Sequence, residues 1–435
     1  GLGRLSADGW LAEKRRREGD ARGLWRVGDH LYDLREFVDR HPGGRFWIEA
    51  TAGTDITEAY ESHHVDKAKA DGLLRKYKLE PTKTPRLSRF TFDEDGFYCT
   101  LRRRVAIQLK QASAGGRGGI MENTGPRWWM RAWMCSHVTV FAVFALLAAM
   151  NASWGCAAAA GVALALVVST AHNFFHQRDN LLMYSFDLSL FQSRTWRVTH
   201  GISHHLFPNT AWDIEVLALE PLLEFFPKRS KNLLTRYGSW LYLHPIFALV
   251  MPATYAVHWL RVASGSTPLC WPNLLPVGEL LLMASVSCYS GHGCSTGMYM
   301  WLAMHVVCSH TFTFWSIFAA HHHPNTWHEG DFQSTGSVDW GEHQLHSITE
   351  RGDICTQGEA AGQVALRAVL GSAMFGDHAL HHLFPTVDHS RLQELYPVFL
   401  TTCKEFNLQF RTLEFKQAMI GLHQQLARNE PAVAQ

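Results

Sequence analysis

The sequence predicts a small soluble α+β domain followed by a mostly helical domain that is embedded in a membrane. Its 435 residues are more than one typical domain needs. Residues 1–80 are polar, with short strand-like runs at Leu24–Val27 and His30–Leu34 between amphipathic stretches. Beyond Arg131 the chain becomes apolar, in runs long enough to cross a bilayer as helices. The two compositions therefore predict two units of different kinds.

The composition narrows the possible functions and the compartment. Lys and Arg number 40 against 39 Asp and Glu, so no overall basic field favours nucleic-acid binding. The 26 histidines and 16 tryptophans are unusual, because imidazole binds transition metals and indole rings collect at membrane interfaces. The nine cysteines are scattered singly, which is typical of reduced thiols facing the cytosol. A basic run at 14–17 replaces an apolar signal core, so we expect the first domain to stay cytosolic.

The first membrane element is a predicted helical hairpin. Ala132–Met150 and Trp154–Ala171 are nearly free of charge, and only residues 151–153 connect them. Both ends of this hairpin lie beside basic residues, namely Arg127, Arg131 and Arg178. By the positive-inside rule, that side is the cytosol.

Further apolar segments follow, and their number leaves the topology open. If the histidine clusters on either side share one compartment, only an even number of these segments can cross. The sequence does not decide which ones do. The segments are Ser239–Leu260, Leu274–Ser290, Gly297–Ala320 and, shorter, Gln363–Phe375.

We place the domain boundaries at residues 1–80, 81–125 and 126–435. The middle stretch carries prolines, the basic run Arg102–Arg104 and the tract Ala114–Gly119, a composition that cannot bury a core of its own. It is interpreted as a linker with a membrane-surface segment.

The N-terminal domain contains a haem-type motif. His41-Pro42-Gly43-Gly44 is followed by Tyr60 and the pair His63-His64, and the run from Asp29 to Leu79 resembles the cytochrome b5 family. The resemblance implies haem b with His41 as one axial ligand. We prefer His64 as the second, with His63 as the alternative. An iron held by two imidazoles changes oxidation state with little rearrangement, which suits electron transfer.

Three histidine clusters predict a metal centre in the membrane domain. Spacings of three and four place side chains on one face of a helix, so each cluster can aim two or three imidazoles at one point. Eight imidazoles exceed what one zinc ion accepts but suit two metal ions, and imidazole suits iron among others. The clusters are His172 and His176; His200, His204 and His205; and His378, His381 and His382.

These clusters resemble the membrane fatty-acid desaturase and hydroxylase superfamily, and the match includes the flanking residues 376–377 and 383–385. The resemblance implies a cytochrome b5-like haem domain followed by an all-α integral membrane desaturase domain, a four-helix bundle with a cytosolic cap. The whole architecture is similar to front-end desaturases, and more so to the arthropod cytochrome b5-related proteins. Front-end enzymes start the third cluster with glutamine, whereas this chain has His378, so their regioselectivity is not assumed. The family also uses a ninth ligand, for which we favour His322 over His321 or His328.

The resemblance implies an oxidoreductase with haem b and two non-haem irons that uses O2 to desaturate a long-chain fatty-acyl lipid or acyl-CoA. Electrons would come from NADH through cytochrome b5 reductase, and no protein base is needed. The protein is expected to be multi-pass in the endoplasmic reticulum bilayer, with haem domain and histidines cytosolic. Two alternatives stay open: a lipid hydroxylase with the same centre, or a haem-binding membrane protein whose desaturase-like part is silent. Carboxylates that could orient the ligands are Asp213, Glu215, Glu342 and Glu350.

Overall fold

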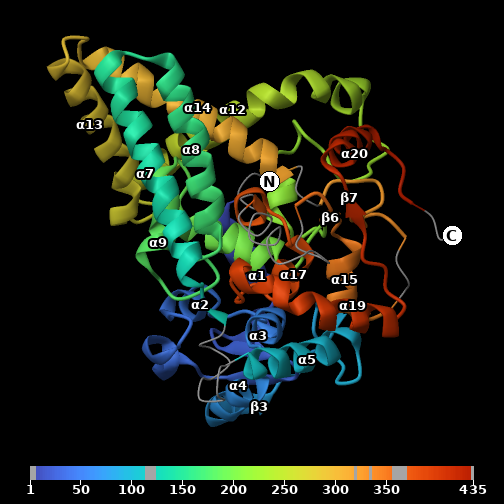
Figure 1. Ribbon diagram of the computed structural model, residues 1–435. Helices are drawn as coiled ribbons and strands as arrows, with labels where there is room; N and C mark the ends of the chain where they lie inside the picture. Colours follow the sequence, from blue (N-terminus) through green and yellow to red (C-terminus); the bar gives the residue numbers. More distant parts are fainter. Residues whose placement is uncertain (1–5, 113–123, 318–320, 333–335, 355–369, 433–435) are drawn as a thin grey trace.

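The computed structural model describes residues 6–112, 124–317, 321–332, 336–354 and 370–432. Figure 1 shows three parts: the N-terminal domain in blue, a bundle of long helices that includes α7, α8, α13 and α14, and a cap that holds the C-terminal elements in red. The cap contacts both the N-terminal domain and the helical bundle. The predicted fold class, an α+β domain followed by a mostly helical one, is confirmed.

The N-terminal domain combines a small sheet with short helices. Strands β1 (Trp25–Val27), β2 (His30–Tyr32) and β3 (Lys78–Pro81) form an antiparallel sheet in that order. The helices of this domain are α2 (Arg45–Ala50), α3 (Thr57–His63) and α4 (Lys67–Leu74), while α1 (Ala7–Arg17) joins the domain to the cap, where Trp10 Nε1 donates to the Trp212 carbonyl at 2.9 Å. Apolar side chains from the sheet and from the helices share one core that includes Trp25, Ile48 and Tyr60.

Four long helices form the bundle. They are α7 (Trp128–Asn151), α8 (Trp154–His172), α13 (Leu275–Tyr289) and α14 (Cys294–Ile317). Glycine allows two of the helix pairs to approach closely: a Cβ at Gly161 would lie 2.5 Å from the Met304 carbonyl oxygen, and one at Gly297 would lie 2.3 Å from that of Met283. Small residues at such crossings are typical of membrane helix packing.

Three helices in the described part of the chain are long and apolar enough to cross a membrane: Trp128–Asn151, Trp154–His172 and Leu234–Ala263. The third contains α12 (Ser239–Ala263), which packs on the C-terminal half of α14. There the Met251 amide donates to Ser309 Oγ at 3.1 Å. The predicted segments Leu274–Ser290 and Gly297–Ala320 correspond to α13 and α14, whereas most of Gln363–Phe375 lies outside the described residues.

Part of the stretch 81–125, interpreted above as a linker with a membrane-surface segment, is folded into the cap. Strand β4 (Phe90–Thr91) pairs in parallel with β5 (Val338–Asp339), and α5 (Phe97–Gln111) packs against α19 (Tyr396–Glu405). The buried side of α5 repeats every four residues, at 97, 101, 105 and 109. This helical repeat among basic residues supplies a core face for the cap. The tract Ala114–Gly119 lies outside the described residues.

The remaining cap elements are short and surround the histidine clusters. A π-helical segment, Arg197–His204, follows α10 (Ser193–Trp196) and carries the second cluster. The third cluster lies on α17 (His378–Leu383). The other described elements of the cap are α9 (Leu181–Tyr184), α11 (Ile214–Leu217), α15 (Trp340–His346), β6 (Glu350–Arg351), α18 (His389–Leu392), β7 (Thr412–Leu413) and α20 (Phe415–Ala427).

Candidate metal centre

The three histidine clusters, distant in sequence, meet at one place in the cap. His172 ends α8 and His176 lies one turn beyond it. The π-helical segment and α17 bring the other two clusters against them, and all eight predicted ligands are buried. The widened π-helical turn is a feature often found at functional sites. Sequence spacing therefore predicted the convergence correctly.

The histidines divide into two groups, here called the five-histidine group and the four-histidine group. In each group, one ligand atom from every residue lies within 4.8 Å of all the others. Nε2 of His172 lies 2.6 Å from Nε2 of His200 in the first group. Nε2 of His321 lies 2.8 Å from Nε2 of His378 in the second. The five-histidine group is His172, His176, His200, His205 and His381, and the four-histidine group is His204, His321, His378 and His382.

The donor set fits two metal ions. Ring nitrogens face one another at distances where lone pairs repel unless a cation or proton lies between them. Both ring nitrogens of His176, and Nε2 of His382, are buried without a hydrogen-bond partner in the described part of the chain. Burial lowers the pKa of His176, His205 and His382 well below the ordinary value. These imidazoles are therefore neutral, the form that binds a metal.

Carboxylates hold two of the ligand rings from outside. Nδ1 of His204 lies 2.9 Å from Asp213 Oδ2, and Nδ1 of His200 lies 3.1 Å from Glu215 Oε2. Each contact keeps the proton on Nδ1 and directs Nε2 to the centre. Burial alone would lower the pKa of His204, but Asp213 and Glu215 outweigh it and raise the pKa to about 8. The same carboxylates would stabilise a cation bound at Nε2.

Two further partners were not predicted. Gln344 Oε1 lies 3.1 Å from Nδ1 of His382, and the Ser347 carbonyl oxygen lies 3.2 Å from Nδ1 of His321. No sequence signal marks an amide or a backbone carbonyl for this role. Of the other predicted carboxylates, Glu350 accepts from the Ala379 amide at 3.0 Å and so supports the start of α17. Glu342 lies in the first turn of α15.

The expectation that His322 joins the cluster is not met, because its neighbour His321 takes that place. The His322 ring stacks on Phe225, with centroids 3.8 Å apart and planes 15° apart. Nδ1 of His328 lies 3.0 Å from the Thr326 carbonyl oxygen, away from both groups. Consecutive side chains in this turn point in different directions, and the sequence alone could not tell which histidine faces the metals.

The predicted axial histidines face each other across a cavity in the N-terminal domain. His41 and His64 have ring centroids 6.2 Å apart, at the edge of a cavity of about 370 Å³. Two metal–nitrogen bonds of about 2 Å each, with the ring radii added, need roughly 6 Å, so an iron fits between them. Their Nδ1 atoms donate to the Gly44 and Tyr60 carbonyls at 2.9 and 2.8 Å, which leaves Nε2 for the iron. His63 instead faces His176, with ring centroids 5.8 Å apart.

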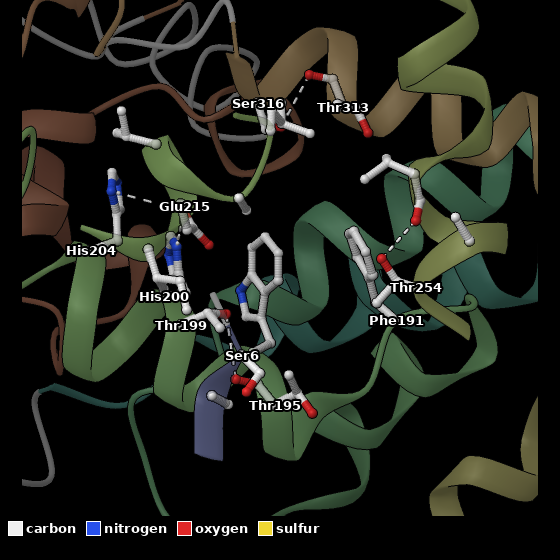
Figure 2. A pocket seen from close by; sticks show the side chains of 18 of the residues that line it. Ser6, Phe191, Thr195, Thr199, His200, His204, Glu215, Thr254, Thr313 and Ser316 are labelled. Carbon is white, nitrogen blue, oxygen red and sulfur yellow. Dashed lines mark hydrogen bonds and ion pairs between the residues drawn. The ribbon is translucent and has the colours of Figure 1, made fainter. Parts of the chain in front are cut away.

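An apolar cavity of about 760 Å³ adjoins the metal centre. His204, His321 and His378 line it at one side, and α12 contributes much of the opposite wall. Figure 2 shows His200, His204 and Glu215 on one side of the cavity, with Phe191 and Thr254 across it. The cavity is thus suited to a long apolar chain that passes the four-histidine group.

Comparison with known proteins agrees with this geometry. The model of the family "Fatty acid desaturase" matches residues 149–414, most of the membrane domain and all the histidine clusters. The chain belongs to the fatty acid desaturase family. The chain also carries a "Cytochrome b5-like Heme/Steroid binding domain", matched over residues 11–81.

Two relatives match this chain over nearly its whole length. It is 37% identical to the cytochrome b5-related protein of Drosophila melanogaster, over 98% of this chain and 93% of the relative. It is 22% identical to fatty acid desaturase 3 of Bos taurus, over 98% of this chain and 91% of the relative. A third similarity, to the acyl-lipid (8-3)-desaturase of Rebecca salina, reaches 47% but covers only 13% of each chain. No solved structure matches the chain.

Proposed function

We propose that this protein is an O2-dependent desaturase of a long-chain fatty-acyl substrate, with electrons supplied through its own haem domain. The observation that carries the proposal is the position of the nine buried histidines, which lie between the cavity beside His41 and His64 and an apolar cavity. That arrangement provides an electron source, a site for two metals and a place for an acyl chain in one molecule.

The residues have distinct roles in this proposal. The five- and four-histidine groups would each hold one non-haem iron, and the bound pair would supply the O2-dependent oxidising chemistry that desaturation of an unactivated methylene needs. Asp213 and Glu215 orient their histidines and offset the charge of the metals. His41 and His64 hold haem b. The apolar cavity binds the acyl chain and excludes water, and no side chain is required as a base.

Membrane insertion and electron supply follow from the same arrangement. We propose that α7 and α8 cross the endoplasmic reticulum membrane and that α12, α13 and α14 lie in the same bilayer beside them. Arg127 and Arg131 at the start of α7 then place the cap, the histidines and the haem domain in the cytosol. There cytochrome b5 reductase can deliver electrons from NADH.

The chemical outcome is tested by expression in a host that lacks its own desaturase, followed by mass spectrometry of the fatty acids. We expect a product two mass units lighter than its precursor, and its loss in His381→Ala. His423→Ala is the matched control, since this half-buried histidine of α20 packs on Trp240 and belongs to neither group. A product that gains oxygen would replace desaturation by hydroxylation. Haem without non-haem iron in the purified wild type would refute enzymatic activity altogether.

A further inference from the structure

The two halves of the metal centre face different partners, and we infer from this a division of labour. We propose that the five-histidine group is the half that receives electrons, through His63 and Trp47, whereas the four-histidine group is the half that faces the acyl chain. The inference rests on the proposed function, because it needs both haem and irons to be bound. It assigns to His63 and Trp47 the role of an electron bridge.

The haem cavity reaches the five-histidine group directly. Besides residues of the N-terminal domain, its wall includes His176 from the first cluster and Gly201 from the second. His63 fills the space between, because its ring centroid lies 5.8 Å from that of His176 and 6.0 Å from that of Trp47. In the sequence, His63 immediately precedes His64, the proposed axial ligand. Its Nε2 atom is buried and has no hydrogen-bond partner in the described part of the chain.

Trp47 is the second contact between the two sites. A Cβ at Gly201 would lie 3.1 Å from Cη2 of Trp47 and 3.7 Å from Nδ1 of His176, so glycine leaves room for the indole and the ligand ring on the same side of this backbone. The guanidinium of Arg197 lies over the Trp47 ring at 5.1 Å and over Phe46 at 5.2 Å. Arg197 is buried and donates to the carbonyls of Phe175 and Gln177, so the indole rests on a fixed cation.

Helix α3, which ends at His63 just before the proposed axial ligand His64, is held against the cap. Arg102 of α5 forms a buried ion pair with Glu61 of α3 at 2.6 Å. Tyr98 Oη donates to the Leu383 carbonyl beside the third cluster, at 3.2 Å, and Thr386 Oγ1 donates to the His63 carbonyl at 3.4 Å. These contacts fix the end of α3 relative to the metal centre, so the bridge does not depend on a transient encounter of the domains.

The apolar cavity touches the other half. Three of the four members of the four-histidine group line it, while His200 is the one member of the five-histidine group that does so among the described residues. Conversely, the haem cavity includes His176 and no described member of the four-histidine group. The asymmetry is therefore present in both walls.

The electron balance is simple. NADH gives two electrons to cytochrome b5 reductase, which passes them on singly. For each electron, one haem goes from ferric to ferrous and back, and one non-haem iron goes from ferric to ferrous. Two passages reduce both irons without a proton being moved by His63.

The test follows this internal transfer without O2 or lipid. Full-length protein with ferric irons is mixed anaerobically with NADH and a catalytic amount of cytochrome b5 reductase. Haem oxidation state is read from its visible spectrum, and iron oxidation state from Mössbauer spectroscopy. We expect His63→Ala combined with Trp47→Ala to slow the reduction of the irons on the order of tenfold or more, about 1.4 kcal/mol in the barrier. The haem spectrum and the iron content should stay as in the wild type.

Two variants separate a bridge from a merely structural role. His63→Phe keeps an aromatic ring between the sites and should restore most of the rate that His63→Ala loses. His30→Phe is the control, because His30 lies on β2 of the same domain and does not line the haem cavity. Wild-type rates in the double alanine variant, with haem and irons fully loaded, would overturn the inference. The measured quantity is the rate of iron reduction, not a lipid product. A protein that does not desaturate lipid can therefore still confirm or refute the bridge, and the two proposals can fail separately.

Discussion

Replacement of Asp213 by asparagine tests whether a carboxylate outside the metal centre controls it. Asp213 is fully buried. Its Oδ2 atom accepts from Nδ1 of His204 at 2.9 Å and from the Asn209 amide at 2.9 Å, while Oδ1 accepts from the Glu215 amide at 3.1 Å. All these partners are donors. An asparagine has one oxygen for the two positions, so its NH2 group must face a donor.

The expected loss of metal affinity follows from the group that the asparagine presents to His204. If the NH2 group faces His204, the ring must move its proton to Nε2, the atom that should bind the metal. Loss of such an outer partner typically weakens metal binding about 10- to 100-fold, which is about 1.4–2.7 kcal/mol. We therefore expect Asp213→Asn to retain the haem but to lose iron from the four-histidine group much faster than the wild type does.

The assay is timed removal of iron by a chelator from purified protein, with iron measured by mass spectrometry and haem by its absorbance. Asp187→Asn is the matched control. Asp187 is also buried and also accepts from a backbone amide, that of Ser193 at 3.0 Å, but it belongs to neither histidine group. Equal rates of iron loss from Asp213→Asn and from the wild type would refute the reasoning, since the ring would then not need its carboxylate.

Three further predictions concern individual side chains. His321→Ala should lose one of two irons and all desaturation, whereas His322→Ala should keep both irons; iron content per haem decides this, and the reverse pattern would contradict the geometry. His64→Ala should abolish the bis-imidazole haem spectrum, while His63→Ala should retain it. Loss of the spectrum in His63→Ala would instead identify His63 as the second haem ligand. Burial raises the pKa of the Asp187 carboxyl to about 7, above the unfolded value of about 4. The folded state therefore holds a proton that the unfolded chain releases, so this carboxyl contributes a loss of stability as pH rises from 5 to about 7, opposite in sign to the buried histidines. The unfolding temperature of Asp187→Asn in detergent should therefore rise relative to that of the wild type over this pH range, and a difference that does not change with pH would contradict the assignment.

The haem domain and the metal-binding character could be predicted from local sequence. The turn at 41–44 and the pair His63-His64 are close in the chain, and the spacings of three and four in the clusters fix which side chains share a helical face. The apolar runs of α7 and α8 were equally local signals, because a span needs only length and composition. Residues 81–125 form a stretch that was interpreted as a linker from composition alone. Its composition hides the helical repeat of α5, whose partner α19 lies almost 300 residues further on, as the contact of Arg104 with Thr402 shows.

The sequence by itself predicted a haem domain, through its resemblance to the cytochrome b5 family, and a gathering of imidazoles beside a membrane, because these signals lie in residue types at short spacings. Only the tertiary structure decided how the imidazoles are divided. His204 and His321 are 117 residues apart, yet their Nε2 atoms lie 3.1 Å from each other, and His322 next to it points at Phe225 instead. The direction of one side chain in a turn depends on what packs around it, and so do the positions of His63 and Trp47 between the two redox sites. Contacts of this kind come from elements far apart in the chain, and no spacing along the sequence encodes them.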